Sequence, residues 1–419
     1  MSEQEIRILL HIPSFANKGD EAMTRTIQSE MRQRFENITF FVEPISVRPG
    51  TEALIANAGL KILYRSTNGV LIDLEFAKQM LRMPRKIRKL WQQRKHMVGC
   101  QEVVRKVDII LDASGYTYAP IWGYGPVLRA TSLAKAARRA NIPYIFLAQC
   151  WGPFNNSPRL NRLYREMLEQ ATLVIARDKQ SQANVLSLLQ KPGQEIVLAP
   201  DMAFRFQSAG REVGKRLLRE HGLDTDQPIV ALAPNMRVYE RTEGKGIDNR
   251  YVQIMTDAAG YFLERGIQVL LVPHEIKANH QEKMDDRSLC ELILQKIGEQ
   301  PKIASIRDMM SSEDMKAMIA CCELLFGSRF HSIIAALQSR VPVVVIGWAH
   351  KYTELLKDVG LEDYGFEYTQ PLDDLDEILG AAWENRATLS QKIDQRVSVL
   401  EAEVSQMFDR VASYLPKST

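Results

Sequence analysis

Cysteine is scarce in this sequence, with five residues in 419 and no C-x-x-C pair. An odd number of cysteines without C-x-x-C spacing is typical of a reducing compartment, where disulfides do not persist. Their spacing matches no metal-binding motif, so we expect no metal site and no bound cofactor. The five are Cys100, Cys150, Cys290, Cys321 and Cys322.

Long apolar runs are absent too, because none approaches the roughly 20 residues that a membrane-spanning helix needs. The acidic start, Met1 to Glu5, leads directly into a strand pattern and does not resemble a signal peptide. The net charge of +3 is too small to argue for binding to nucleic acid. We therefore expect a cytoplasmic protein without a nucleic-acid partner. Internal repeats and low-complexity segments are also lacking.

One segment is much more basic than the rest of the chain. Residues 78–106 contain ten Lys or Arg and a single acid, Glu102, with Trp91 and several Leu and Met interleaved. A basic helix with such an apolar side can lie on an anionic membrane, which would place residues 79–104 at the inner face of the membrane. The alternative is a solvated helix that packs on its own domain. We treat residues 50–106 as an insertion in the fold.

Apolar strand patterns alternate with helical patterns twice along the chain. This alternation predicts an α/β protein with two doubly wound domains, whose parallel sheets face each other across a cleft. We expect an N-terminal domain over 1–206, a linker or short connecting helix over 207–227 and a C-terminal domain over 228–372. The helical tail over 373–419 is long enough to cross back to the first domain.

Polar residues follow many of these strands at the point where ligands bind in open α/β sheets. Small residues there let a ligand approach the backbone, and an aromatic loop from Tyr116 to Tyr124 could stack on sugar rings. The alternatives are helix capping, for Asp20 above all, and packing of the rings in the core. The candidates are Asn17, Asp20, Ser114, Gly115, Gln149, Arg177, Asn235 and His274.

The stretch Leu324 to Ser332 shows this arrangement most clearly. A buried strand ends at Gly327, and a helical pattern begins at Ser332, so Arg329 and His331 lie on a tight turn. Arginine can bind a carboxylate or phosphate through two parallel hydrogen bonds, and histidine can donate a proton near neutral pH. The pair therefore suits an anionic substrate, although capping of the turn explains it equally well.

Several motifs together resemble the polysaccharide pyruvyl transferase family, in an order that spans residues 6 to about 360. None is decisive alone, but their order and spacing across two domains are specific. They are Asn17-Lys18-Gly19-Asp20, Ala148-Gln149 with Gly152-Pro153, Ala176-Arg177-Asp178, Ala199-Pro200-Asp201, Val272-Pro273-His274 and Gly327-Ser328-Arg329-Phe330-His331.

The resemblance implies two Rossmann-like domains in a GT-B-like arrangement and transfer of pyruvate from phosphoenolpyruvate to a sugar as a cyclic ketal, with release of phosphate. By this resemblance Arg177, Arg329 and Ser328 would bind phosphoenolpyruvate, and His331 would be the general acid. The C-terminal domain would hold the donor and the N-terminal domain the acceptor, a carbohydrate that can be linked to a polyprenyl carrier. The other candidates named above would bind the acceptor or assist.

Two features differ from the family pattern, the sequence Ala113-Ser114-Gly115 in place of a glycine pair and the long basic insertion. Both belong to the expected acceptor side. The alternative functions are a glycosyltransferase of the same architecture with a nucleotide-sugar donor, and a non-catalytic binding or assembly protein.

Overall fold

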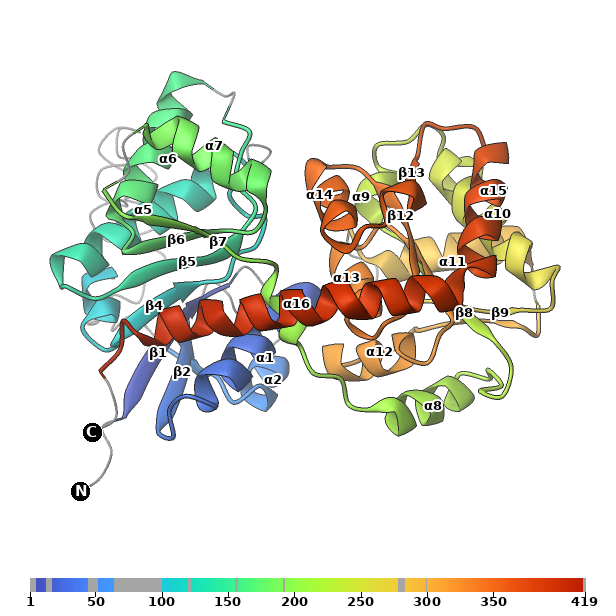
Figure 1. Cartoon of the computed structure of the whole chain (residues 1–419), viewed down its shortest axis with the longest axis horizontal. Helices are drawn as coiled ribbons and strands as arrows, with labels where there is room; N and C mark the ends of the chain where they lie inside the picture. Colours follow the sequence, from blue (N-terminus) through green and yellow to red (C-terminus); the bar gives the residue numbers. More distant parts are fainter. Residues whose placement is uncertain are drawn as a thin grey trace, which may run out of the picture.

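The computed structural model describes residues 5–12, 17–43, 52–63, 100–119, 122–154, 157–190, 193–277, 283–298 and 300–416. They form two α/β domains joined side by side (Figure 1). None of the helices within these ranges is both long and apolar enough to cross a membrane.

The N-terminal domain contains a seven-stranded parallel sheet in the order β3-β2-β1-β4-β5-β6-β7. The order changes direction between β1 and β4, which creates a crevice at their carboxyl ends. Most of its strands are continuous apolar runs, as expected for parallel strands that helices cover on both faces. The strands are β1 (Ile6–His11), β2 (Ile38–Val42), β3 (Lys61–Ile62), β4 (Ile109–Asp112), β5 (Tyr144–Gln149), β6 (Leu173–Ala176) and β7 (Glu195–Leu198).

The C-terminal domain repeats the design with six parallel strands in the order β10-β9-β8-β11-β12-β13. Here the crevice lies between β8 and β11. The strands are β8 (Ile229–Ala233), β9 (Gln268–Leu271), β10 (Ile303–Ser305), β11 (Leu324–Gly327), β12 (Val343–Gly347) and β13 (Gly365–Glu367).

Helices alternate with these strands, and several begin with a side chain that caps the first free N–H groups. Ser157, for example, caps α6, with Pro158 in the first turn. The helices of the first domain are α1 (Lys18–Arg32), α2 (Glu52–Asn57), α5 (Tyr124–Arg139), α6 (Pro158–Gln170) and α7 (Lys179–Leu189). Those that follow are α8 (Arg211–Glu220), α9 (Met236–Tyr239), α10 (Arg250–Leu263), α11 (Asp286–Ile297), α12 (Ser312–Ile319), α13 (Phe330–Gln338), α14 (His350–Val359), α15 (Asp373–Glu384) and α16 (Arg386–Ala412).

The long helix α16 crosses from the C-terminal domain back to the first, as predicted. It contacts α13 and α14 of the C-terminal domain and α1 of the first domain, and Figure 1 shows it running along both domains. Its buried side chains recur at helical spacing, from Leu389 through Ile393, Val397 and Val404 to Val411. The fold class inferred from the sequence is therefore confirmed.

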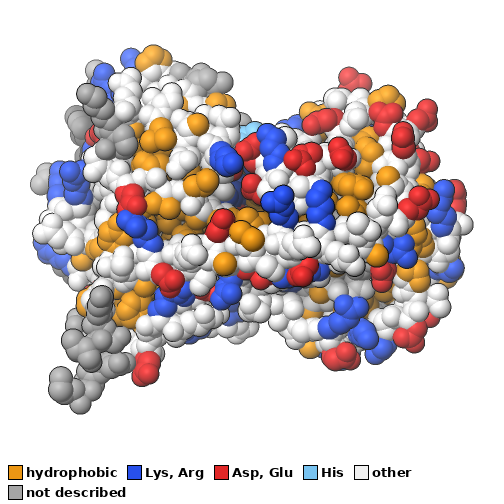
Figure 2. All heavy atoms as spheres, viewed as in Figure 1, with side chains coloured by type: hydrophobic (Ala, Val, Ile, Leu, Met, Phe, Trp, Pro, Cys, Tyr) orange, Lys and Arg blue, Asp and Glu red, His pale blue; other side chains and the backbone are white. Residues whose placement is uncertain are grey.

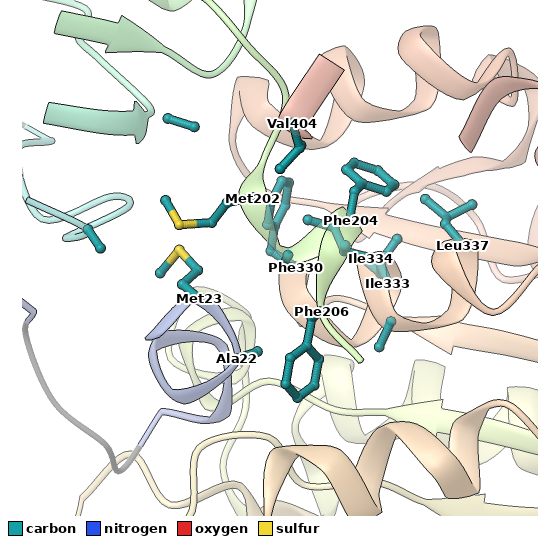
Figure 3. Close-up of a cluster of buried hydrophobic side chains, with 14 of the residues drawn as sticks. Ala22, Met23, Met202, Phe204, Phe206, Phe330, Ile333, Ile334, Leu337 and Val404 are labelled. Carbon is teal, nitrogen blue, oxygen red and sulfur yellow. The ribbon is translucent and has the colours of Figure 1, made fainter. Parts of the chain in front are cut away.

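One hydrophobic cluster continues through both domains. At its centre is the short 3₁₀ helix η3 (Met202–Arg205), which contacts α1, α13 and α16. Figure 3 shows Met202 facing Met23 of α1, while Phe204 lies beside Ile334 and Leu337 of α13. The two domains are thus joined by shared core packing beside the chain that connects them.

The segment predicted as a linker or short connecting helix contains α8, which packs on α12 of the C-terminal domain. Residues 52–63 of the expected insertion form α2 and the edge strand β3, so the start of that segment belongs to the sheet. The sequence pattern missed this strand because it has only two residues.

The basic segment proposed to contact the membrane lies mostly outside the described residues. Of residues 79–104, only 100–104 are described, and they are helical. Cys100, Val103 and Val104 are buried in the core of the first domain. This end of the segment therefore packs on the protein itself.

Candidate active site

The carboxyl ends of both sheets open into one cleft with a volume of about 430 Å³. Figure 2 shows a notch between the two domains, with basic and histidine side chains beside it. The backbones of the two walls also meet directly, because Lys18 N–H donates to the His274 carbonyl (3.1 Å). The cleft is lined by Asn17, Asp20, Ser114, Gly115, Arg177, Asn235, His274, Arg329 and His331 from the sequence prediction, among others.

His331 occupies the first turn of α13 and packs against the first turn of α1 from the other domain. A Cβ atom at Gly19 would lie only 1.9 Å from its Nδ1, so glycine is what lets the imidazole sit there. Asn17 caps α1 by accepting the Gly19 N–H (2.9 Å). The cap is thus Asn17, whereas Asp20, the predicted alternative cap, lines the cleft from inside the first turn.

Asp201 lies behind His331 and connects it to Arg177. Its Oδ2 is 3.7 Å from His331 Nε2 and 2.9 Å from Arg177 Nη1. Burial alone would raise the pKa of Asp201, but His331 and Arg177 outweigh burial and hold it well below its usual range. Asp201 is therefore a carboxylate that orients both cleft residues. Asp201 was not among the residues predicted for the site, although it belongs to the motif Ala199-Pro200-Asp201.

Arg177 follows β6 and is 6% exposed. Its guanidinium stacks on the Phe330 ring, 4.4 Å from the ring centre. Nη2 has no hydrogen-bond partner among the described residues, so it can donate to a ligand oxygen. This placement agrees with the predicted role in binding an anion.

Arg329 lies in the cleft wall, but its charge is already matched inside the protein. Nη1 donates to Glu275 (3.2 Å) and Nη2 to Asp286 (2.5 Å), and all three side chains are buried. Asp286 also accepts the backbone N–H groups of His274 and Glu275. Arg329 thus supports the His274 loop. Its Nε has no hydrogen-bond partner among the described residues and is available for the predicted contact with the donor.

His274 stacks parallel to His331, with ring centres 6.4 Å apart. Burial, together with the nearby His331 and Arg329 side chains, lowers its pKa well below the ordinary value. His274 is consequently a neutral ring in the cleft wall, where its nitrogens have no protein partner within the described ranges.

Two of the predicted site residues do not reach the cleft. The Ser328 hydroxyl is fully buried and lies 2.5 Å from the Tyr251 hydroxyl. Gln149 is also fully buried and donates to the side chain (2.8 Å) and carbonyl (3.0 Å) of Asp112. Both predictions are corrected: Ser328 follows β11 and Gln149 is the last residue of β5, but each side chain is buried and bonds to groups inside its own domain.

The remaining candidates shape the walls. Asn235 lines the cleft, yet its side chain donates to the Ser328 carbonyl (2.7 Å) and caps α9. Ser114 donates to Asp112 (2.6 Å), and Gly115 has a positive φ of 64° that favours glycine. Of the aromatic loop, Tyr116 and Trp122 line the cleft, whereas Tyr118 is buried in the core.

Lys351 is the most informative residue that the sequence analysis passed over. It follows β12 in the first turn of α14, and its ammonium lies 4.5–5.3 Å from the ring centres of Tyr116, Phe330, Trp348 and Tyr352. Burial and the nearby Arg177 lower its pKa to about 7. The sequence does contain a pattern that could have indicated this residue, since Lys351 comes shortly after an apolar strand as Arg177 and Arg329 do.

Further cations join these in the cleft, namely Arg129, Arg237 and Lys277, against the acids Asp20 and Glu275. An excess of positive groups with low water access suits a small, multiply charged anion. Fold and cleft together define a two-domain α/β protein of the GT-B-like type, with a cleft between the domains that is lined by several cations and by His331.

The chain belongs to the polysaccharide pyruvyl transferase family, whose model matches residues 17–350. It is 21% identical over 277 residues to the amylovoran biosynthesis protein AmsJ of Erwinia amylovora, a match that covers 64% of each chain. The chain thus spans less than two thirds of the length of this curated relative.

Solved structures with the same architecture are more distant in sequence. A UDP-GlcNAc 2-epimerase from Neisseria meningitidis, bound to UDP-GlcNAc, superposes with a TM-score of 0.61 at 9% identity, covering 98% of this chain and 99% of that one. Anabaena Alr3699/HepE in complex with UDP-glucose gives a TM-score of 0.58 at 13% identity, covering 98% and 100%. At these identities the likeness concerns the fold alone.

Proposed function

We propose that this protein transfers pyruvate from phosphoenolpyruvate to a sugar of an exopolysaccharide or cell-envelope intermediate, as a cyclic ketal. The observation that carries the proposal is the group formed by His331, Asp201 and Arg177 in a cationic cleft, within a chain of the pyruvyl transferase family. A cytoplasmic location and an acceptor linked to a polyprenyl carrier remain parts of this proposal.

The donor would bind with its phosphate and carboxylate against Arg177 and Lys351. His331 would give a proton to the methylene carbon of phosphoenolpyruvate, which becomes the methyl group of the ketal. The neighbouring carbon then has oxocarbenium character and takes a first sugar hydroxyl. A second hydroxyl displaces phosphate by cleavage of the carbon–oxygen bond. Of the two hydroxyl protons, one restores His331 and the other leaves with phosphate.

No metal or cofactor is needed for these steps. The His331–Asp201 distance of 3.7 Å allows the carboxylate to orient the ring without taking its proton. On the acceptor side, Tyr116 and Trp122 offer ring faces against which a sugar can pack.

The second candidate is a glycosyltransferase with a nucleotide-sugar donor, favoured by the UDP-containing structures that share the fold. Calorimetric titration of the full chain with phosphoenolpyruvate and with UDP separates the two. We expect binding of phosphoenolpyruvate that weakens strongly in Arg177→Met. Tight binding of UDP together with no binding of phosphoenolpyruvate would reverse the assignment.

Lys351 should make donor binding depend on pH. Its pKa of about 7 means that it is charged below this pH and neutral above it. Between about pH 6 and about pH 8 the wild-type protein should therefore lose affinity for phosphoenolpyruvate relative to Lys351→Met. Calorimetry of both proteins across this range measures the difference in affinity. Protonation of the ligand itself affects both proteins equally and cancels in this comparison. Parallel pH profiles would contradict the role of Lys351.

Gly19→Ala should lower turnover by at least about 100-fold, because the new methyl group displaces the His331 ring by an ångström or more. Gly260→Ala is the matched control, since Gly260 lies in α10 with no atom within 4 Å of its added Cβ. Phosphate release measures the effect, and thermal unfolding confirms that both variants fold. Full activity of Gly19→Ala would show that the ring position is not critical.

A further inference from the structure

A second polar cluster lies beside the cleft and takes no part in the steps above. It consists of Cys150 directly after β5, Asp178 at the start of α7, and His350 at the start of α14. The Cys150 Sγ is 3.2 Å from His350 Nε2, and one ligand atom of each residue lies within 4.8 Å of the others. None of the three lines the cleft itself.

The cluster is not accounted for by hydrogen bonding within the protein. Asp178 uses Oδ1 to accept the Ser181 N–H (2.6 Å) and so caps α7. Its Oδ2 has no hydrogen-bond partner in the described part of the chain, although the residue is only 6% exposed. A buried carboxylate oxygen without a partner is costly, and its position next to a thiol and an imidazole points to a missing cation.

The electrostatic surroundings favour the form of cysteine that binds metals. Burial would raise the pKa of the Cys150 thiol, but the hydrogen bond with His350 and the charge of Arg177 outweigh it and lower the pKa. The thiolate is the ligand form of cysteine, and metal binding releases the proton that thiol and imidazole share.

We propose that Cys150, Asp178 and His350 form a binding site for a divalent transition metal, with Zn²⁺ as the best match. Sulfur, imidazole and carboxylate ligands in tetrahedral geometry are typical of zinc, and the soft thiolate disfavours Mg²⁺ and Ca²⁺. Tetrahedral zinc would place sulfur and nitrogen about 3.6 Å apart, so the pair must open by only about 0.4 Å. A fourth position remains for water.

Such a metal would join the two domains. Cys150 and Asp178 belong to the first domain and His350 to the second, where Lys351 is the next residue. The negative charges of thiolate and carboxylate would offset the charge of Zn²⁺. The nearby cation Arg177, which itself pairs with Asp201, would limit the affinity of the cluster for the metal. The site would fix the domains around the donor pocket. The sequence could not show it, because its first and last ligands are 200 residues apart.

Titration of the metal-free full chain with Co²⁺ tests the proposal independently of enzymatic activity. We expect one Co²⁺ per chain and an absorption band from thiolate-to-cobalt charge transfer, which Zn²⁺ abolishes by displacement. Cys150→Ser should remove the band. Cys321→Ser should retain it, because Cys321 is a partly exposed cysteine just after α12 and is not part of the cluster.

Asp178→Asn tests the carboxylate while keeping the helix cap, because asparagine caps as well as aspartate. Its affinity for Co²⁺ should fall by at least about 10-fold. His350→Asn should have a similar effect, with His221→Asn on α8 as the control. Absence of stoichiometric binding, or a band that persists in Cys150→Ser, would overturn the proposal.

Discussion

Replacement of His331 by alanine should lower phosphate release from phosphoenolpyruvate by about 10²- to 10⁴-fold, the range typical of a lost general acid. Binding of phosphoenolpyruvate should change little, because Arg177 and Lys351 remain in the cleft wall. The effect should therefore appear in kcat, measured with a saturating acceptor, while calorimetry shows a bound donor.

His221→Ala is the control for this experiment, since His221 directly follows α8, contacts the Leu217 carbonyl and does not line the cleft. Asp201→Asn should give an intermediate loss, because the ring keeps its place against Gly19 but loses the carboxylate that orients it. Turnover of His331→Ala near the wild-type rate would remove His331 from the mechanism.

Arg329→Met should have the largest effect on folding. The substitution leaves the buried carboxylates of Glu275 and Asp286 without their cation, which typically costs about 3–5 kcal/mol of unfolding free energy. Urea unfolding of the variant measures the loss. Arg216→Met, which removes an exposed pair with Glu220 on α8, should change stability little.

The triple variant Arg329→Met, Glu275→Gln and Asp286→Asn separates the two roles of Arg329. If the arginine mainly balances the two acids, neutralising all three groups should restore part of the lost stability. Unchanged stability of Arg329→Met with complete loss of donor binding would instead support the ligand-binding role inferred from the sequence.

The fold followed from the sequence because apolar runs and helical patterns are local features. Most of the apolar runs form parallel strands, for example Leu173 to Ala176 and Val343 to Gly347. Residues that follow these strands line one common cleft. The two-residue strand β3 was missed because its pattern is too short to distinguish from a loop.

The sequence indicated which residues lie at the ends of strands, but it did not indicate which side chains contact each other there. Arg329 pairs with acids 43 and 54 residues away, and no spacing rule shows that such partners lie within reach. Ser328 and Gln149 lie at the carboxyl ends of strands as His274 does, yet their side chains turn inward to hydroxyl and carboxylate partners. Side-chain direction after a strand depends on the turn, which the sequence pattern does not determine.

The family match and the cleft geometry lead to one central claim, transfer of pyruvate from phosphoenolpyruvate. The most direct test is turnover of phosphoenolpyruvate in D₂O with a panel of saccharides and lipid-linked saccharides that carry neighbouring hydroxyls. Mass spectrometry and NMR should show a pyruvate ketal whose methyl group carries one deuterium from solvent, with one phosphate released per ketal. A ketal without solvent deuterium, or transfer of a sugar from a nucleotide sugar and none of pyruvate, would contradict the claim.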